Sequence, residues 1–314
     1  MAKFPVDIIA AEVVSSVVHL PMTRSLPLTL ARNLGITRNV VASPPFRPLA
    51  RMLSRHKAIP LDLLLGANLD VTFTAQFPGA SFLYHAAPED GLGARFYWQS
   101  WSDWEPHVIP VFARYAKTAS RILDIGAHTG VYTLFACALN PGLEVFSFEP
   151  LPQIHPRLRD NVRVNRFDSR CRLFQIAVSD SPGVASFHVA EDPSMSTLCD
   201  NGEIQVRVAT LDSLIPLDGR TDLVKMDVEG HEYRALRGME KIMEDSHPTI
   251  LFECNPGAPG KQVGELLQSH GYNLFSLVGG VEEKLNELIP EHFPSGNHNF
   301  LATHPSREKV APAN

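Results

Sequence analysis

The sequence has few cysteines, no long apolar run and no excess of positive charge. Four cysteines occur among the 314 residues, and no two of them are spaced as a Cys-x-x-Cys pair. This argues against a zinc site or a disulfide framework and predicts reduced thiols in a cytoplasmic protein. No stretch reaches the roughly 20 apolar residues of a membrane-spanning helix. The apolar segment 8–21 contains Glu12 and follows a single lysine, which is a poor match to a signal peptide.

The charge balance is slightly acidic. The formal net charge is −6 and the isoelectric point is near 6.1, so the chain lacks the basic character typical of a nucleic-acid-binding protein. The 13 histidines are scattered without a ligand-like spacing, and we assign no metal site from them. We therefore expect a globular protein that binds no nucleic acid and has no membrane span. Nothing in the sequence indicates its oligomeric state.

The first hundred residues differ in composition from the rest of the chain. Residues 21–60 are rich in proline and basic residues and predict at most short helices, near 28–34 and 47–56. Two β-prone segments flank Pro78 and Gly79, which is typical of a hairpin. We interpret residues 1–100 as an N-terminal extension with short helices and this hairpin, and residues 305–314 as a C-terminal tail.

Strand-like and helix-like segments alternate between residues 101 and 304. The strand-like runs are 121–126, 144–150, 172–180, 222–230, 249–254, 272–277 and 299–304. Such alternation is typical of βαβ units. It predicts an α/β domain with a doubly wound, Rossmann-like sheet of seven mostly parallel strands and helices on both faces. The insertion at 183–215 predicts extra β structure at the rim of this domain.

Acidic residues and glycines stand where the predicted strands end. These positions are Asp124 with Gly126 and Gly130, then Glu149, the turn from Ala177 to Asp180, Asp227 with Glu229, and Glu253 with Asn255. In a doubly wound sheet, ligands bind at the carboxyl ends of the strands. We therefore predict that these residues surround a ligand.

The turn after the first strand, DIGAHTG, indicates the class of ligand. Its glycines allow the backbone to pass close to a bound molecule. Glu149 follows Asp124 near the ~20-residue offset at which an acid accepts hydrogen bonds from ribose hydroxyls. The turn lacks the middle glycine of a dinucleotide-binding motif and carries an acid, which favours a cationic, phosphate-free nucleoside such as S-adenosylmethionine. The alternatives are an NAD-dependent oxidoreductase and a non-catalytic binding subunit.

Seven short segments carry a resemblance to a known family. They are ILDIGAHTGVYTL, FEPLPQIHPRLRDNVRVN, AVSDSPGVASF, MSTL, ATLDSL, LVKMDVEGHEYRALRGM and ILFECN. In this order, across about 120–255, they resemble the FkbM family of S-adenosylmethionine-dependent methyltransferases. The blocks K-x-D-V-E-G-x-E and A-V-S-D are specific to that family. His128 departs from it, because the family more often has Asn there.

The resemblance implies a class I methyltransferase that methylates a hydroxyl of a sugar, glycan or secondary metabolite. By motif position, it implies that Asp124, Gly126 and Gly130 line the methionine part of S-adenosylmethionine. It also implies that Glu149 holds the ribose and that the Ala177–Asp180 turn borders the adenine. The acceptor would be a small molecule or a glycan, and its identity is not readable from the sequence.

The segment KMDVEGHE supplies candidates for proton transfer. The resemblance implies that Asp227 faces the reacting end of the cofactor; Glu229 follows two residues on, and His231 titrates near neutral pH. A hydroxyl acceptor must pass its proton to a base or a metal, so we predict Asp227, Glu229 and His231 as catalytic residues. Glu232 is expected only to stabilise the following helix. The acids could instead hold Mg²⁺, which their spacing permits without requiring.

Overall fold

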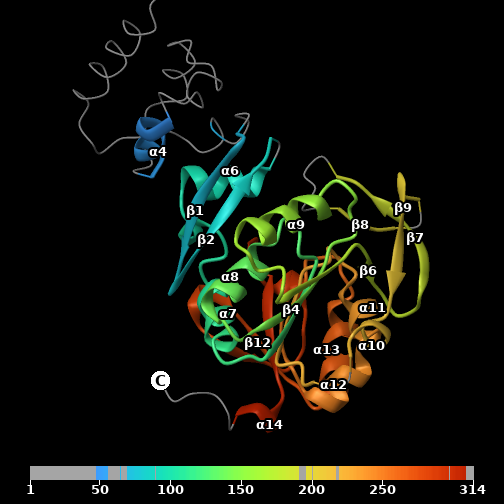
Figure 1. Cartoon of the computed structure of the whole chain (residues 1–314). Helices are drawn as coiled ribbons and strands as arrows, with labels where there is room; N and C mark the ends of the chain where they lie inside the picture. The colour runs from blue at the N-terminus through green and yellow to red at the C-terminus, as the bar shows by residue number, and fades with distance from the viewer. Residues whose placement is uncertain are drawn as a thin grey trace, which may run out of the picture. The chain divides into compact units, whose positions relative to one another are not determined.

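The computed structural model describes residues 47–55, 64, 69–88, 90–190, 196–199, 201–216, 219–296 and 298–308 (Figure 1). The chain divides into two compact units, one of residues 1–69 with 88–99 and one of residues 70–87 with 100–314. The helix predicted near 28–34 and the apolar segment 8–21 lie outside the described residues. The larger unit contains every described strand.

The smaller unit contains two described helices, α4 (Arg47–Arg55) and α6 (Gly91–Trp98), which contact each other. Asp90 caps α6 because its side chain accepts a hydrogen bond of 2.8 Å from the N–H of Gly93. The guanidinium of Arg51 lies 4.8 Å from the ring centroid of Tyr97, which adds a cation–π contact between the helices. The short helix predicted near 47–56 is confirmed.

The larger unit is built on an eight-stranded sheet in the order β13-β12-β14-β11-β10-β3-β4-β5. Its strands are β3 (Arg121–Ile125), β4 (Glu144–Phe148), β5 (Cys171–Phe174), β10 (Leu223–Met226), β11 (Thr249–Glu253), β12 (Asn273–Ser276), β13 (Glu283–Leu285) and β14 (Asn299–Thr303). The pairings from β5 to β11 are parallel, and those from β11 to β13 are antiparallel. The predicted doubly wound α/β fold is confirmed.

Two details of the predicted sheet are wrong. It has eight strands and not seven, because β13 adds an edge strand whose sequence, EKL, is mostly exposed and carries no apolar run. The run at 172–180 was predicted as one strand, but it divides after Phe174. Its second half, β6 (Ala177–Val178), pairs with β9 (Ile204–Ala209) in a separate sheet.

Helices cover both faces of the large sheet (Figure 1). On one side lie α7 (Val108–Ala116), α8 (Val131–Leu139) and α9 (His155–Val164); on the other lie α11 (Glu232–Arg237), α12 (Glu240–Ser246) and α13 (Gly260–Ser269). Buried Leu236, Met243 and Leu267 of the second group pack with strand residues such as Val224 and Phe252 in one core. The strands can read as continuous apolar runs because both faces are covered in this way.

The predicted hairpin is present as β1 (Val71–Phe77) and β2 (Ala80–Ala86). It packs on α8 and α9 and therefore groups with the larger unit, although the sequence places it in the N-terminal extension. Phe77 lies 5.0 Å from Phe135 between ring centroids. The Oδ1 atom of Asn161 accepts a hydrogen bond of 2.8 Å from the N–H of His85.

A second sheet of four strands has the order β6-β9-β7-β8, where β7 is Gly183–His188 and β8 is Thr197–Leu198. It confirms the extra β structure predicted for the insertion. The remaining elements are α10 (Leu211–Leu214), α14 (Pro305–Glu308) and the 3₁₀ turns η1 (Trp101–Asp103), η3 (Val278–Gly280) and η4 (Pro290–His292). No helix of the described residues has the length and apolar content to cross a bilayer.

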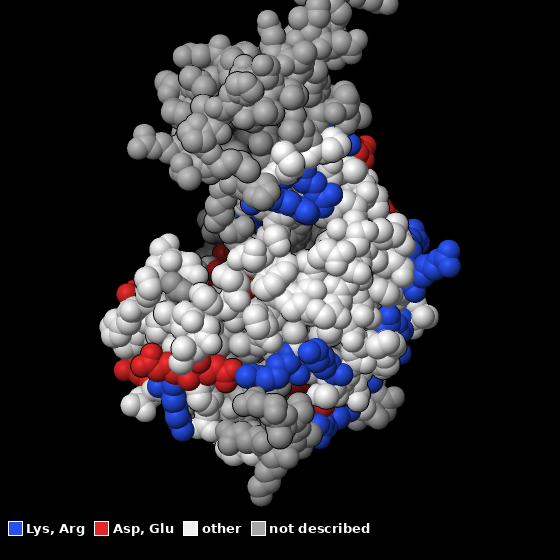
Figure 2. Space-filling model, turned by 90° about the vertical axis from the view of Figure 1, so that its left-hand side faces the viewer, with Lys and Arg blue, Asp and Glu red and all other residues white. Residues whose placement is uncertain are grey.

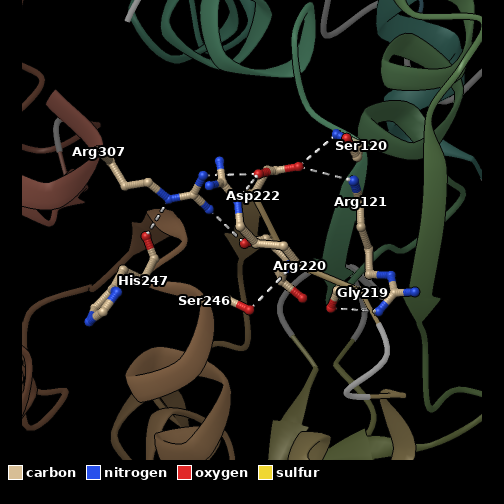
Figure 3. Close-up of polar contacts among 9 residues, drawn as sticks. Ser120, Arg121, Gly219, Arg220, Asp222, Ser246, His247 and Arg307 are labelled. Carbon is tan, nitrogen blue, oxygen red and sulfur yellow. Dashed lines mark hydrogen bonds and ion pairs between the residues drawn. The ribbon is translucent and has the colours of Figure 1, made fainter. Parts of the chain in front are cut away.

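The amino ends of the central strands are joined by an ionic network (Figure 3). The carboxylate of Asp222, just before β10, accepts a hydrogen bond of 2.7 Å from the N–H of Ser120 and one of 3.0 Å from Nη1 of Arg307. Arg307 also donates to the carbonyl oxygens of Thr221 at 2.8 Å and His247 at 3.0 Å. This network fixes α14 to the sheet, so residues 305–308 of the predicted tail are ordered.

Charged side chains of both signs adjoin on the surface. Figure 2 shows Asp and Glu side chains meeting Lys and Arg side chains in a band across the lower part of one face. One ion pair between segments far apart in the sequence joins Arg114 of α7 to Glu282, just before β13.

Two of the cysteines, far apart in the sequence, are neighbours in the fold. The Sγ atoms of Cys137 in α8 and Cys171 in β5 lie 3.4 Å apart. All four cysteines are free thiols: Cys199 is exposed, whereas Cys137 and Cys254 are buried.

Candidate active site

The site lies at the point where the order of the sheet reverses. From β3 the chain proceeds to β4 and β5 on one side, and it later places β10 and β11 on the other side of β3. The carboxyl ends of β3 and β10 therefore border the crevice in which doubly wound folds bind ligands. Glu149, Asp227 and Glu253 follow or end β4, β10 and β11 at this edge.

Asp124 lies near the carboxyl end of β3, and Gly126 and Gly130 lie in the turn that follows it, as predicted. Contacts within the protein account for much of the need for these residue types. The Asp124 carboxylate is buried and accepts a hydrogen bond of 2.6 Å from the hydroxyl of Thr133. Burial raises the pKa of Asp124 to about 6. A Cβ on Gly126 would lie 1.8 Å from the carbonyl oxygen of Asp227, and one on Gly130 would lie 2.5 Å from Leu158 Cδ1. Both glycines also have positive φ, at +78° and +94°.

Glu149 is the buried acid at the end of β4. Its Oε2 atom accepts a hydrogen bond of 2.9 Å from the N–H of His128, and its Oε1 atom accepts one of 2.8 Å from the N–H of Leu151. Burial raises the pKa of Glu149 to about 7, although these backbone hydrogen bonds oppose the shift. Each carboxylate oxygen has a further lone pair, so Glu149 keeps acceptor capacity for hydroxyl groups of a ligand.

Ala177 and Asp180 lie at β6, in the second sheet and not in the large one. Ala177 is buried, whereas Asp180 is exposed and accepts hydrogen bonds from the hydroxyls of Ser179 at 3.3 Å and Ser181 at 3.2 Å. Their assignment to an adenine pocket stays a prediction.

Three carboxylates from distant parts of the chain converge beside β10. Glu105, Asp227 and Glu253 each place an oxygen within 4.8 Å of the others. The Nζ atom of Lys225 lies 3.5 Å from Asp227 Oδ2, and the lysine side chain is only 1% exposed. Tyr132 donates a hydrogen bond to Glu105. Burial and the charge of Asp227 raise the pKa of Glu253 to about 8.

Lys225 supplies the positive charge that this carboxylate cluster requires. Burial lowers the pKa of Lys225, but the negative charges of Asp227, Glu105 and Glu253 raise it by more, so the pKa lies above its usual range. Its Nζ atom also lies 5.0 Å from the ring centroid of Tyr132. The ammonium therefore stays charged beneath the three acids.

Glu229 joins the cluster through Asn255. The Nδ2 atom of Asn255 donates to Glu253 Oε1 at 2.9 Å and to Glu229 Oε2 at 3.4 Å. Burial, with the nearby charges of Asp227 and Glu232, raises the pKa of Glu229 to about 7. Glu229 has a left-handed backbone with φ of 49°, and its carbonyl accepts a hydrogen bond of 2.7 Å from Thr197 Oγ1 of β8. The insertion therefore contacts the site.

His231 lies apart from the carboxylates. Its Nε2 atom is 3.1 Å from the hydroxyl of Ser179, beside the second sheet. Burial lowers the pKa of His231 to about 4, which makes it a weak base near neutral pH. Glu232 begins α11 and accepts a hydrogen bond of 2.9 Å from the N–H of Gly230, as expected for an acid at a helix start.

A cavity of about 930 Å³ adjoins the carboxylate cluster. Its acidic wall is formed by Glu105, Glu229 and Glu253, with Asn255 between the latter two. The rest of its described lining is Gly230, Pro256, Gly257, Ala258, Phe293, Ser295, Gly296, His298 and Asn299. A cavity of this size can hold a drug-sized or disaccharide-sized molecule.

Sequence reasoning missed Glu105 and Lys225 as site residues. Lys225 had a readable signal, because a lysine inside an otherwise apolar strand run needs a buried counter-charge. Asn255, two residues after Glu253, was expected at the same strand end but had no assigned role. Glu105 precedes the first strand of the sheet, and no local pattern marks it.

Comparison with known proteins identifies the family. Residues 124–276 match the family described as "Methyltransferase FkbM domain". The chain is 31% identical over 191 residues to the 31-O-demethyl-FK506 methyltransferase FkbM of Streptomyces tacrolimicus, an alignment that covers 49% of this chain and 72% of the relative. The chain belongs to the FkbM methyltransferase family.

Two further relatives belong to the same comparison. The chain is 28% identical over 193 residues to the hexuronic acid methyltransferase AglP of Haloferax volcanii, covering 58% of this chain and 78% of the relative. It is 30% identical over 144 residues to the 2-O-methyltransferase NoeI of Sinorhizobium fredii, covering 39% and 58%. This FkbM-family chain is therefore a methyltransferase. The alternative of an NAD-dependent oxidoreductase is set aside. The family implies S-adenosylmethionine as the cofactor.

Proposed function

We propose that this FkbM-family methyltransferase transfers a methyl group from S-adenosylmethionine to a hydroxyl of a sugar, a glycan or a secondary metabolite. The observation that carries the proposal is the carboxylate cluster of Glu105, Asp227 and Glu253, which lies beside the cavity at the carboxyl edge of the sheet. The names of the relatives, which include a hexuronic acid methyltransferase and a 2-O-methyltransferase, support an oxygen acceptor.

The residues at β3 and β4 fit the cofactor. S-adenosylmethionine supplies a methyl group on a positively charged sulfur. Glu149 keeps free lone pairs for the ribose hydroxyls, and the backbone of the Gly126–Gly130 turn and the Asp124 carboxylate lie beside it. β4 is two strands from β10, so at ~4.8 Å per strand the two strands are about 10 Å apart across the sheet. This separation suits a nucleoside whose sugar is near Glu149 and whose sulfur is near Asp227.

Proton transfer requires a base next to the acceptor. The acceptor oxygen would form a bond to the methyl carbon as the bond from that carbon to sulfur breaks, which releases S-adenosylhomocysteine, and the hydroxyl proton must pass to a neighbouring group. Glu229 and Glu253 line the cavity, and their pKa values of about 7 and about 8 place them near the optimum for a base at neutral pH. We assign the role of base to Glu229 and Glu253. Asp227 pairs with Lys225 at 3.5 Å, and its negative charge would also attract the positively charged sulfur of the bound cofactor.

A metal ion is not required by this arrangement. Lys225 already places a positive charge 3.5 Å from Asp227 Oδ2. The proposal therefore uses protein carboxylates alone, and treatment with a chelator should leave turnover unchanged. Loss of activity on chelation that Mg²⁺ restores would reassign Glu105, Asp227 and Glu253 as ligands.

The test of the proposal is binding of S-adenosylhomocysteine, measured by calorimetry. Glu149→Ala should weaken binding about tenfold or more, because hydrogen bonds to a charged group contribute roughly 1.5–3 kcal/mol. Asp160→Ala, an exposed acid on α9, is the matched control and should bind normally. A folded Glu149→Ala variant with unchanged affinity would remove Glu149 from the cofactor site.

A further inference from the structure

The cavity has one strongly acidic wall. Of the described residues that line it, Glu105, Glu229 and Glu253 are acids, and the basic one is His298. Lys225 is buried beneath the wall and paired with Asp227, so its charge is directed to the cluster and not to a ligand. Bound anions would therefore face carboxylates at short range.

The same wall offers hydrogen-bond acceptors to hydroxyl groups. Asn255 holds Glu229 and Glu253 side by side with donor–acceptor distances of 3.4 Å and 2.9 Å. Each carboxylate keeps lone pairs for a hydroxyl or ammonium donor. Two carboxyl groups held side by side in this way can each accept a hydrogen bond from one of two neighbouring hydroxyls on a ring.

An apolar surface completes the cavity. Phe293, Pro256 and Ala258 line it, and Phe293 is fixed by an edge-to-face contact with Phe300 at 5.1 Å between ring centroids. A pyranose ring presents C–H groups on its faces and hydroxyls around its rim. The combination of an aromatic ring with paired acceptors matches both features.

On this basis, and resting on the methyl transfer proposed above, we propose that the acceptor is a polyhydroxylated ring without negative charge, either a neutral sugar or an amino sugar. A carboxylated sugar would bring a third anion next to Glu229 and Glu253. Both carboxyls already have raised pKa values because of burial and the charge of Asp227. An ammonium group would instead gain attraction from the wall.

The experiment measures binding to the full chain saturated with S-adenosylhomocysteine. The probes are the methyl glycosides of glucosamine, glucose and glucuronic acid, and the corresponding galactose series, at 50 mM salt. The amino sugar should bind at least as tightly as the neutral sugar, and the uronate at least tenfold more weakly than the neutral sugar. The discrimination should shrink in 0.5 M salt because screening weakens charge–charge interactions.

A double variant and a control test whether Glu229 and Glu253 cause the difference in affinity between neutral sugar and uronate. Replacing both Glu229 and Glu253 by Gln should reduce the difference between neutral sugar and uronate to threefold or less. Glu244→Gln, an exposed acid on α12, is the control and should keep the difference. If the double variant fails to fold, the salt dependence of the wild type tests the same point.

Two outcomes would overturn the proposal. One is a uronate that binds within threefold of the neutral sugar or more tightly. The other is failure of every probe to bind at 10 mM while S-adenosylhomocysteine binds, which would remove sugars as the acceptor class and leave methyl transfer standing. Failure of S-adenosylhomocysteine itself to bind would remove the proposed function and this inference together.

Discussion

The carbonyl oxygen of Asp227 lies 1.8 Å from the position that a Cβ on Gly126 would occupy. The turn after β3 and the end of β10 are therefore in direct backbone contact, and the N–H of Asp227 donates a hydrogen bond of 2.9 Å to the carbonyl of Ile125. This contact positions the proposed cofactor turn against the strand end that carries the carboxylates.

Gly126→Ala should disrupt the site far more than Gly230→Ala. Both glycines have positive φ, at +78° and +94°, so both substitutions strain the backbone, but an added Cβ on Gly230 meets no atom within 4 Å. We expect Gly126→Ala to abolish binding of S-adenosylhomocysteine or to prevent folding, and Gly230→Ala to cost about 1–2 kcal/mol of stability. Calorimetry and thermal unfolding of the two variants provide the comparison. Equal effects would mean that the contact with Asp227 is unimportant.

Asp227→Asn should lower turnover and largely preserve cofactor binding. Asn keeps the shape of the side chain but loses the negative charge that pairs with Lys225. That charge also helps to raise the pKa of Glu229 and Glu253, which makes them better proton acceptors. Loss of proton-transfer assistance typically costs 10²–10⁴-fold in rate, and we expect a decrease in this range with a labelled methyl donor. Asp245→Asn, an exposed acid on α12, is the control. Near-normal turnover would make Asp227 a structural residue.

The rate should rise with pH through neutrality. Glu229 and Glu253 must be deprotonated to accept a proton, and their pKa values are raised to about 7 and about 8, in each case mainly by burial. Turnover should therefore increase between pH 6 and pH 9, and Glu229→Gln should remove the part of the rise near pH 7. A profile that is flat over this range in the wild type would show that neither acid is the base.

Glu232→Gln should stabilise the protein above neutrality and leave it unchanged in acid. Glu232 is 1% exposed, and its Oε2 atom has no hydrogen-bond partner among the residues that the structure describes. Burial raises its pKa from 4.5 to about 7, so the folded state holds a proton that the unfolded chain loses. This destabilising contribution is absent below pH 4.5 and complete above about pH 7. We expect a gain of ~1–3 kcal/mol at pH 8 and none at pH 4.5, measured by urea unfolding.

Arg307→Met should destabilise the larger unit by about 1.5–3 kcal/mol, because it removes the donor that joins the Asp222 carboxylate to the carbonyl oxygens of Thr221 and His247 (Figure 3). Arg220 still pairs with Asp222 at 2.9 Å in this variant. Arg237→Met removes an exposed pair with Glu240 at 3.0 Å and should cost less than about 1 kcal/mol. Unfolding by denaturant measures both. A similar small effect for the two variants would show that the network contributes little.

The sequence predicted the sheet well because its central strands are buried on both faces. Runs such as 121–126 and 249–254 are short and mostly apolar, and all seven predicted strands exist. The edge strand β13 was missed because exposed Glu283 and Lys284 give it no apolar pattern. The division of the run at 172–180 depends on the pairing of Ala177 with Val208, which is a long-range contact without a local signal.

The candidate site was predictable where it follows strand ends and unpredictable where it depends on the fold. Glu149, Asp227 and Glu229 were found because each follows a recognisable strand. Glu105 reaches the cluster from the segment before the sheet, which only the three-dimensional arrangement reveals. His231 is two residues after Glu229 in the chain but contacts Ser179, because a strand end followed by a helix start directs nearby side chains to different sides.

The thiols of Cys137 and Cys171 lie 3.4 Å apart, so the rate at which Cys137 is chemically labelled can report local opening at this side of the sheet. Cys137 is buried in α8 and its neighbour belongs to β5, the last strand on that side of the sheet. Because Cys137 is buried, a thiol reagent can reach it only when the structure around it opens, so its labelling rate in the native protein measures how often this region opens. Exposed Cys199 would react at once and serve as the internal reference for the intrinsic reactivity of an accessible thiol.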